Sequence, residues 1–523
     1  MESSIDEGFE STAFRILRDS KPVEEKVVKF GDVNEDYSFR VYLMPRHLDP
    51  TDAQSKMRRP YAQHPEFMDV EYFPYVLAKL NGARQVLPVD YFGNFDLTVG
   101  NIEPNERDVE QRVDIRRYKF RISKQVYELA NKLTIDDTFV RMFESFNGEG
   151  YELYRELVHV FQKYIDIPRW CAANAALWVM ATYVYQGFSA FPYLMLLAER
   201  GSGKSRMLRL ITMLSSNGLF WVSASLSSLF RAVEALKPTL GLDEIEYIND
   251  ERNPNGQELL NLLNSGYERG AVVPRVNKDS KMMVEYFDAY CPKAIATTQD
   301  LAGVLNSRCL RIPIARTLNK EFVTRDPIAD RIVLDDLQRE LTFWAIDNGA
   351  AIAAMDKKEV EAKFRNLPAF ADVPPRIFQI MLPVLTMYDF LKLSESSSMD
   401  KDSMFADELG DLEKCIDYQT QEAKAQSVDD DVQRIMAALY HYVKNVGVPV
   451  STQGIIETLG LEIEEKKFYS PKKIGRTVRK FNVPKRDIHG LAEYFGGSKW
   501  SQENAVRFLD DVLKRYSIDV SEK

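Results

Sequence analysis

Runs of apolar residues, separated by turn-forming residues, divide the chain into predicted helices and strands. Near the middle, no charged residue occurs from Trp170 to Ala198. Gln186, Gly187 and Pro192 interrupt this stretch, so that it divides into CAANAALWVMATYVY and YLMLLA. These have the lengths of a buried helix and a buried strand. The whole stretch is long enough to cross a bilayer, but the breaks make a membrane span the less favoured alternative.

Similar patterns predict the organisation of the rest. Residues 1 to about 115 mix short apolar runs such as FRVYLM and RQVLPVDYF with turn-rich segments, and residues 116 to 168 have a helical pattern. Strand-like and helix-like runs then alternate to about residue 393, as in an α/β sheet with its helices. We therefore expect an α+β N-terminal domain over 1–165, an α/β domain over 166–393, a polar connection over 394–427 and a C-terminal domain over 428–523.

The segment AERGSGKS, residues 198 to 205, lies between the predicted strand YLMLLA and the predicted helix RMLRLITML. A glycine-rich loop in this position presents backbone N–H groups to phosphates, while a lysine reaches the β and γ oxygens and a hydroxyl binds Mg²⁺. The alternative is a glycine-rich turn without a ligand. We predict an ATP site formed by Ala198, Gly201, Ser202, Gly203, Lys204, Ser205 and Arg206, with Ser205 also a Mg²⁺ ligand. Ala198 stands where the usual pattern has glycine.

Two further strands are candidates for the hydrolytic residues. PTLGLDEIEY ends in acids, and Asp243 follows Lys204 by 39 residues, which suits one intervening helix and strand. Asp243 is a candidate Mg²⁺ ligand and Glu244 a candidate for polarising the attacking water. CPKAIATTQ has the pattern of a third buried strand, and in sheet ATPases of this kind that strand lies between the other two. Thr298, or else Thr297, would orient the water. The alternative for Asp243 and Glu244 is an acidic strand end exposed to solvent, and the alternative for the threonine is ordinary turn chemistry.

Two arginines are candidate contacts to the transferred phosphate. Arg308, in LAGVLNSRCLRIPI, lies in a short turn where it can complete the ATP site of a neighbouring subunit. The alternative is a surface arginine with an acidic neighbour. Arg376, in VPPRIFQIMLPVL, opens a helix of the predicted lid and can contact the γ-phosphate.

Together, WVSASLSSLFRAVEALKPTLGLDEIEYI, ELLNLLNSGYERGAVVPRV and CPKAIATTQDLAGVLNSRCLRIPI resemble the ATPase module of helicases and primase-helicases of plasmids, viruses and integrated elements. More broadly, the chain resembles the MCM-like, superfamily 3-like branch of the AAA+ ATPases over about residues 165 to 393. The resemblance implies an AAA+ P-loop core with a helical lid and a hexameric ring with ATP at subunit interfaces. One subunit would contribute Lys204, Ser205, Asp243 and Glu244, and the next would contribute Arg308.

The resemblance also implies a hairpin before the third strand that grips DNA in the central channel. The sequence supports that hairpin independently, because AVVPRV and KMMVEYF flank a turn-forming tetrad, Asn277 to Ser280. Lys278, Lys281 and Arg275 would contact phosphates. Any exposed hairpin can carry such lysines, which is the alternative.

The resemblance does not extend to a primase site. Asp69 and Glu71 alternate in MDVEY, but no histidine or third acid accompanies them. A solvated strand face is therefore favoured over a metal site, and primase activity is in doubt.

Composition limits the remaining classes. The net charge is −10 and hydrophobic residues make up 45%, as in ordinary globular protein rather than a basic nucleic-acid coat. The four cysteines are scattered without a CxxC pair and the five histidines lie apart from them, which predicts reduced thiols, a cytoplasmic protein and no structural zinc. The acidic N-terminus lacks the features of a signal peptide.

The C-terminal part contains a local basic segment. KKFYSPKKIGRTVRKFNVPKR holds nine Lys or Arg and no acid, and Ser470 with Pro471 predicts a helix start. Two helices precede this helix, and HGLAEYFGGSKW has the pattern of a glycine-containing hairpin, an order typical of a winged-helix DNA-binding module. A solvated lysine face or a contact with acidic protein is the alternative. One helix face would hold Ile474, Val478 and Phe481, and the other Lys472, Lys473, Arg476, Arg479 and Lys480.

The leading hypothesis is thus an ATP-dependent hexameric DNA helicase, most simply one that replicates a mobile genetic element. The main alternative is an AAA+ initiator, loader or remodelling ATPase that binds duplex DNA without processive unwinding. A scaffold that uses ATP only to stabilise its oligomer is the third.

Overall fold

The computed structural model describes most of the chain in two units. The described residues are 26–28, 31–47, 70–80, 82–89, 94–103, 112–122, 135–221, 226–250, 252–276, 284–301, 303–393, 408–427, 430–459, 471–488 and 491–516. The contacts between residues divide the chain into Met1–Ile416 and Asp417–Lys523. The boundary falls inside the range predicted as the connection, within a helix.

Two β-sheets form the N-terminal part. An antiparallel sheet contains β2 (Gly31–Val33), β3 (Ser38–His47), β4 (Val70–Leu80) and β5 (Ala83–Pro88) in that order. A second sheet has the order β1 (Lys26–Val28), β7 (Arg112–Ile122) and β6 (Asn94–Glu103), with β1 parallel to β7. A helical pattern was expected from residue 116, which is wrong for 116–122. There Tyr118 and Phe120 alternate with basic residues, the period of a half-buried strand.

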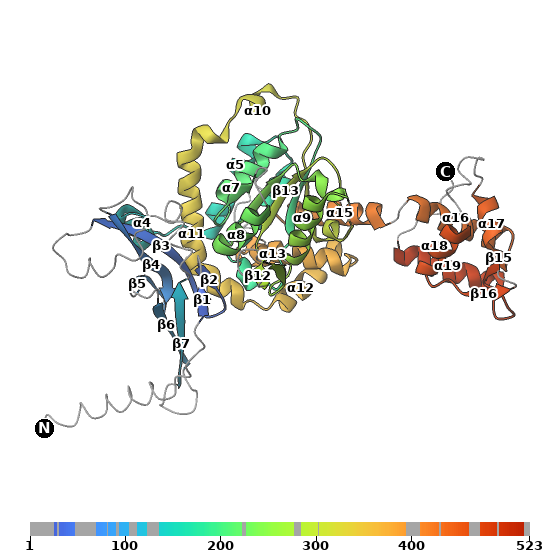
Figure 1. Ribbon diagram of the computed structural model, residues 1–523, viewed down its shortest axis with the longest axis horizontal. Coiled ribbons are helices and arrows are strands. Elements are labelled where there is room, and N and C mark those ends of the chain that lie inside the picture. Colours follow the sequence, from blue (N-terminus) through green and yellow to red (C-terminus); the bar gives the residue numbers. More distant parts are fainter. Residues whose placement is uncertain are drawn as a thin grey trace. The chain divides into compact units, whose positions relative to one another are not determined.

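The four-stranded N-terminal sheet packs against the next domain through the long helix α11 (Arg331–Ala354), which Figure 1 shows beside the blue strands. Ser38 Oγ donates a hydrogen bond to the Ala345 carbonyl at 3.1 Å, and Arg84 forms an ion pair with Asp347 at 2.6 Å. The buried Arg40 donates to the carbonyl of Tyr183, at the end of a helix of that domain. The two domains therefore belong to one compact unit.

The α/β domain is built on a five-stranded parallel sheet. Its order is β14 (Cys309–Pro313), β8 (Tyr193–Leu197), β13 (Lys293–Thr297), β10 (Leu240–Asp243) and β9 (Leu219–Trp221). This order confirms that the third predicted strand, β13, lies between the other two. Figure 1 shows the sheet with α7 (Lys204–Leu214), α8 (Leu226–Leu236) and α9 (Pro254–Ser265) around it.

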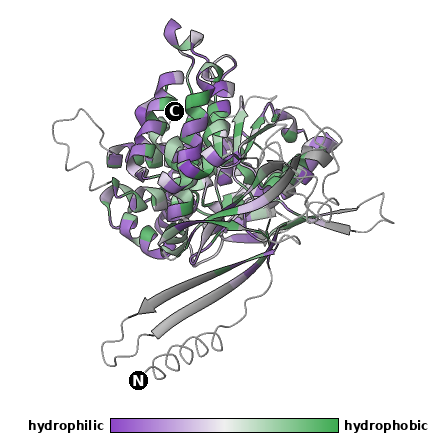
Figure 2. Cartoon of the chain, turned by 90° about the vertical axis from the view of Figure 1, so that its left-hand side faces the viewer, coloured by the Kyte–Doolittle hydropathy of each residue, from purple (hydrophilic) through white to green (hydrophobic). Residues whose placement is uncertain are grey.

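Apolar side chains hold these layers together. The uncharged stretch before the glycine-rich loop forms helix α6 (Arg169–Thr182), buried almost all round, followed by β8. The predicted division into a helix and a strand is confirmed. Figure 2 shows green and purple alternating along many helices, so that each of these has an apolar and a polar face. Among the described residues, no helix combines the length and the apolar character that crossing a membrane requires.

The two strands of the predicted hairpin are described by the structure. Strands β11 (Val272–Val276) and β12 (Val284–Asp288) pair antiparallel, with Val272 opposite Asp288. Lys237 donates a hydrogen bond at 2.7 Å to the carbonyl of Asp288, the last residue of β12. The buried Lys293 donates to the carbonyls of Ala289 and Cys291. The turn between the strands, which includes Lys278 and Lys281, lies outside the described residues.

Helices α10 (Lys320–Thr324), α11, α12 (Lys357–Arg365) and α13 (Pro375–Phe390) follow the sheet, as expected of a helical lid. The next helix, α15 (Glu408–Ser427), begins in a buried cluster with α5 (Gly150–Tyr164) and α6. Arg169 of α6 forms ion pairs with Glu408, at 2.6 Å, and with Asp411, and Tyr154 donates to Glu408. This cluster ties the first turn of α15 to the helix that leads into β8.

The second unit has the predicted order of elements. Helices α16 (Asp430–Asn445), α17 (Thr452–Thr458) and α18 (Pro471–Lys480) precede β16 (Lys485–Ile488) and β17 (Leu491–Tyr494), and α19 (Gln502–Tyr516) is the last described element. The short strand β15 (Val450–Ser451) completes a three-stranded antiparallel sheet in the order β15-β17-β16. Ile474, Val478 and Phe481 are buried in the core of this unit, as predicted for the apolar face of α18.

Candidate active site

The glycine-rich loop follows β8 and opens α7, which is the context that phosphate binding requires. Gly201 and Gly203 have φ angles of +77° and +96°, a region that side-chain-bearing residues rarely adopt. Ala198 is buried and its N–H donates to the Thr297 carbonyl at 3.2 Å, so that the loop starts beside the end of β13. The buried Ser202 hydroxyl has no hydrogen-bond partner among the described residues.

Lys204 and Ser205 occupy the first two positions of α7. Lys204 is 8% exposed, a low value for lysine, and Ser205 is half-buried. The guanidinium of Arg206 donates to the Phe322 carbonyl, which joins the first turn of α7 to α10. Arg206 thus has a partner within the chain, whereas the loop itself leaves backbone N–H groups at a helix N-terminus, where phosphate binds well.

Asp243 and Glu244 lie at the carboxyl end of β10, and β13 lies between β10 and the strand that leads into the loop, β8. In the sheet register Asp243 is level with Ala296 of β13, and Leu197 of β8 is level with Thr297. Asp243 is half-buried and Glu244 is exposed. Glu244 has a φ angle of +54°, in the left-handed region that residues other than glycine seldom adopt.

Thr298 follows β13 and is held by Glu246, a residue that the sequence analysis did not select. The backbone N–H and the hydroxyl of Thr298 both donate to Glu246 Oε1, each at 2.9 Å. Burial alone would raise the pKa of Glu246, but these hydrogen bonds and the nearby Lys204 outweigh it, and its pKa lies below the usual value. Thr297 instead closes a turn, because its hydroxyl donates to the Gln299 carbonyl at 2.7 Å.

Arg308 and Arg376 lie at the opposite end of the strands, where β8 and β14 begin. Arg308 directly precedes β14, whose first residue, Cys309, is level with Tyr193 at the start of β8. At about 3.3 Å per residue, the five residues of β8 put roughly 15 Å between this end and the glycine-rich loop. Arg308 therefore lies too far from the glycine-rich loop to contact a ligand bound at that loop in the same chain.

The two arginines flank one buried tyrosine. The guanidinium carbons of Arg308 and Arg376 each lie 5.1 Å from the ring centroid of Tyr267, within cation–π range. Arg308 also donates to the Asn264 carbonyl, and Arg376 donates to the Ser307 carbonyl at 2.8 Å. Arg376 is the second residue of α13, as predicted, and its side chain is directed toward Arg308. Tyr267 was not selected from the sequence.

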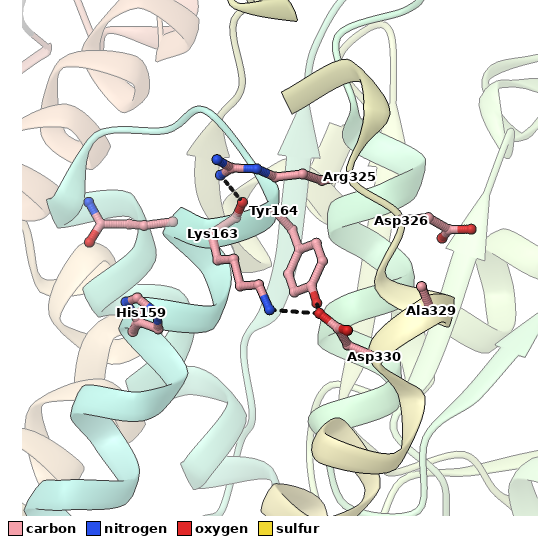
Figure 3. A pocket seen from close by; sticks show the side chains of 8 residues that line it. His159, Lys163, Tyr164, Arg325, Asp326, Ala329 and Asp330 are labelled. Atoms are coloured by element: carbon pink, nitrogen blue, oxygen red, sulfur yellow. Dashed lines mark hydrogen bonds and ion pairs between the residues drawn. The ribbon is translucent and has the colours of Figure 1, made fainter. Parts of the chain in front are cut away.

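Hollows in the described part of the chain include one at the carboxyl end of the sheet and one beside α5. One, of about 550 Å³, is lined by the end of β8, by Thr298 and Asp300, and by residues 314–316, so that it opens at the carboxyl edge of the sheet. The other, of about 630 Å³, lies between the end of α5 and the segment after α10, and Figure 3 shows its polar lining. There Lys163 pairs with Asp330 at 2.6 Å and Arg325 donates to the Lys163 carbonyl at 2.6 Å. Both cations in this hollow thus have partners within the chain.

The predicted DNA-binding residues are less completely described. Arg275 is in β11, but its side chain and those of Lys472, Lys473 and Lys480 lie outside the description, as does Ser470. Arg476 and Arg479 of α18 are exposed. Glu71 belongs to β4, where it pairs in register with Arg46, and Asp69 lies outside the described residues. Among the described residues there is no cluster of three or more His, Cys, Asp or Glu that could hold a metal ion by itself.

Known proteins give little guidance. No family model and no curated protein matches the chain. Solved structures do match it, among them one described as "SCCmec type IV Cch - active helicase", at 12% sequence identity and a TM-score of 0.37. The match covers 96% of this chain and 83% of that chain. Because both the identity and the TM-score are low, the function of this chain rests on its own site geometry.

Proposed function

We propose that the protein is an ATP-dependent DNA translocase that works as a ring of identical subunits, most simply a replicative helicase of a mobile element. One observation carries the proposal. The glycine-rich loop after β8, the acidic end of β10 and the polar end of β13 meet where the strands of the parallel sheet end. Arg308 lies where the strands begin. Such an arrangement supplies a complete hydrolytic site only when two subunits adjoin.

The residues at the loop fit a triphosphate with Mg²⁺. The buried Ser202 hydroxyl without a partner and the N–H groups of the loop are donors suited to phosphate oxygens. Ser205 and Asp243 offer oxygen ligands, which Mg²⁺ prefers, and Mg²⁺ is commonly held by one or two such groups together with substrate phosphates. When bound, Mg²⁺ supplies positive charge that stabilises the phosphate oxygens.

The remaining residues serve the transfer itself. Lys204 binds the β- and γ-phosphates, and Glu244 orients a water and takes a proton from it. The water oxygen bonds to the γ-phosphorus as the bond to the bridging oxygen breaks, which gives ADP and inorganic phosphate. Arg308 of the adjoining subunit stabilises the charge that develops on the transferred group, and Arg376, packed on the same tyrosine, acts beside it.

Hydrolysis at each interface moves the hairpin that carries Lys278 and Lys281 and so draws one DNA strand through the ring. The test is displacement of a labelled strand from a forked duplex. We expect unwinding by the native chain, none by Glu244→Gln, and at least about a tenfold loss for Lys278→Ala, since a phosphate contact is removed. Lys358→Ala, on the exposed face of α12, serves as the control and should unwind normally.

The initiator or loader alternative is favoured by the winged-helix order of the second unit, which suits duplex DNA. The same assay separates the two. If DNA stimulates ATP hydrolysis but no strand is ever displaced, the helicase proposal fails and the alternative stands. If the native chain hydrolyses no ATP with or without DNA, both fail.

The exposed arginines of α18 give a separate prediction. Replacing Arg476 and Arg479 together by alanine should weaken duplex binding roughly tenfold for every sequence tested, because phosphate contacts are lost. The slope of log affinity against log salt should become shallower by about two. A salt titration by fluorescence anisotropy measures both. Arg507→Ala, which removes an exposed arginine of α19, is the matched control, and an equal loss in this variant would refute a specific role for α18.

A further inference from the structure

Glu246 connects the segment after β10 to Thr298, which directly follows β13. It belongs to a short 3₁₀ turn, Glu246–Asn249, that directly follows Asp243, Glu244 and Ile245. One carboxylate oxygen, Oε1, accepts two hydrogen bonds from Thr298, from the backbone N–H and from the hydroxyl, both at 2.9 Å. Thr298 is thus held at two atoms by a single acceptor.

A second contact joins the same two segments. The side-chain amide of Asn249 donates to the Asp300 carbonyl at 2.9 Å, and Asp300 forms an ion pair at 2.9 Å with Arg311, a buried residue of β14. The turn after β10 and the loop after β13 therefore keep a fixed relation at the carboxyl edge of the sheet, next to the loop that begins at Ala198.

The direction of the hydroxyl bond determines what Thr298 can do. A threonine hydroxyl has one hydrogen and two lone pairs. Because the hydrogen is given to a carboxylate, the lone pairs face away from Glu246 and can only accept. A hydroxyl that donates to an ionised group is also a stronger acceptor, since successive hydrogen bonds polarise one another. A water beside Thr298 would consequently be turned so that one of its hydrogens points at the threonine.

We propose that Glu246 is a positioning residue for ATP hydrolysis, which holds Thr298 as a hydrogen-bond acceptor for the attacking water. This inference rests on the proposed function, with Glu244 as the group that receives the proton. Glu246 itself does not touch the water or the nucleotide; it acts through Thr298. Its negative charge is the property that matters, because a neutral acceptor of the same shape would hold Thr298 in place but polarise it less.

The effect of the negative charge of Glu246 can be separated from the effect of its hydrogen bonds with Thr298. Glu246→Gln keeps an oxygen that can accept both bonds from Thr298, so a purely structural role predicts normal activity for it. We expect instead that kcat for ATP falls about tenfold while KM is not raised and the thermal unfolding midpoint is unchanged. Thr298→Val should also lower kcat, and Thr298→Ser should retain most of it. Asp250→Asn, an exposed acid close by, is the control and should match the native chain.

The double variant completes the test. If Glu246 acts through Thr298, adding Glu246→Gln to Thr298→Val should cost little more than Thr298→Val alone. A native kcat in Glu246→Gln, or losses that multiply in the double variant, would overturn the inference while leaving the proposed function standing, provided that Glu244→Gln remains inactive. Absence of ATP hydrolysis in the native chain would overturn both.

Discussion

Glu244→Gln is expected to bind ATP but to hydrolyse it at least about 10² times more slowly than the native chain, the loss typical of removing a catalytic base. The substitution keeps the size of the side chain and removes only its ability to take a proton. Lys204→Ala is expected to lose binding as well as hydrolysis, because the proposed function assigns the buried Lys204 to the β- and γ-phosphates.

Phosphate release under saturating ATP and the affinity for a fluorescent ATP analogue distinguish these two variants. Glu359→Gln, which alters an exposed glutamate on α12, provides the comparison and should behave as the native chain does. Hydrolysis at the native rate by Glu244→Gln would show that the catalytic assignment at the end of β10 is wrong.

Arg308→Ala is expected to lower kcat by about 10³ or more, since an arginine supplied from a neighbouring subunit contributes that much to phosphoryl transfer. The distinctive result concerns mixtures. Arg308→Ala and Lys204→Ala should each be inactive alone, but in the proposed ring a mixture would contain interfaces where an intact loop meets an intact arginine. Mixing the two variants should therefore restore part of the hydrolysis, to a level that depends on their ratio.

Because Arg308 also packs on Tyr267, the unfolding midpoint of Arg308→Ala must be compared with that of the native chain. Arg308→Lys keeps the charge but not the planar fork and should remain strongly impaired. Arg331→Ala, at the exposed start of α11, is the control. Mixtures no more active than their separate components would exclude a site shared between subunits.

Local sequence patterns predicted the strand, the loop and the helix at this candidate site. A loop between an apolar strand and a helix is specified by neighbouring residues, so the positions of Lys204 and Ser205 followed directly. The place of β13 in the middle of the sheet followed from the resemblance and is confirmed by the strand order.

Contacts between distant segments could not be predicted in the same way. Glu246 meets Thr298 only because two strands lie side by side, and nothing within DEIE indicates which acid does so. Tyr267 lies between two arginines that are far apart in the sequence. The period-two pattern around Phe120 was readable but was outweighed by the helical pattern that follows it. The roles of Lys278 and Lys281 stay predictions.

The attachment of α15 has a practical consequence for dividing the protein. A shortened chain that stops near residue 393, just after α13, would delete Glu408 and Asp411 and remove the acceptors of the Arg169 guanidinium and of the buried Tyr154 hydroxyl. Fragments of the first unit should therefore extend through Ser427, so that α15 keeps the acceptors of Arg169 and Tyr154 in place beside α6, the helix that precedes β8.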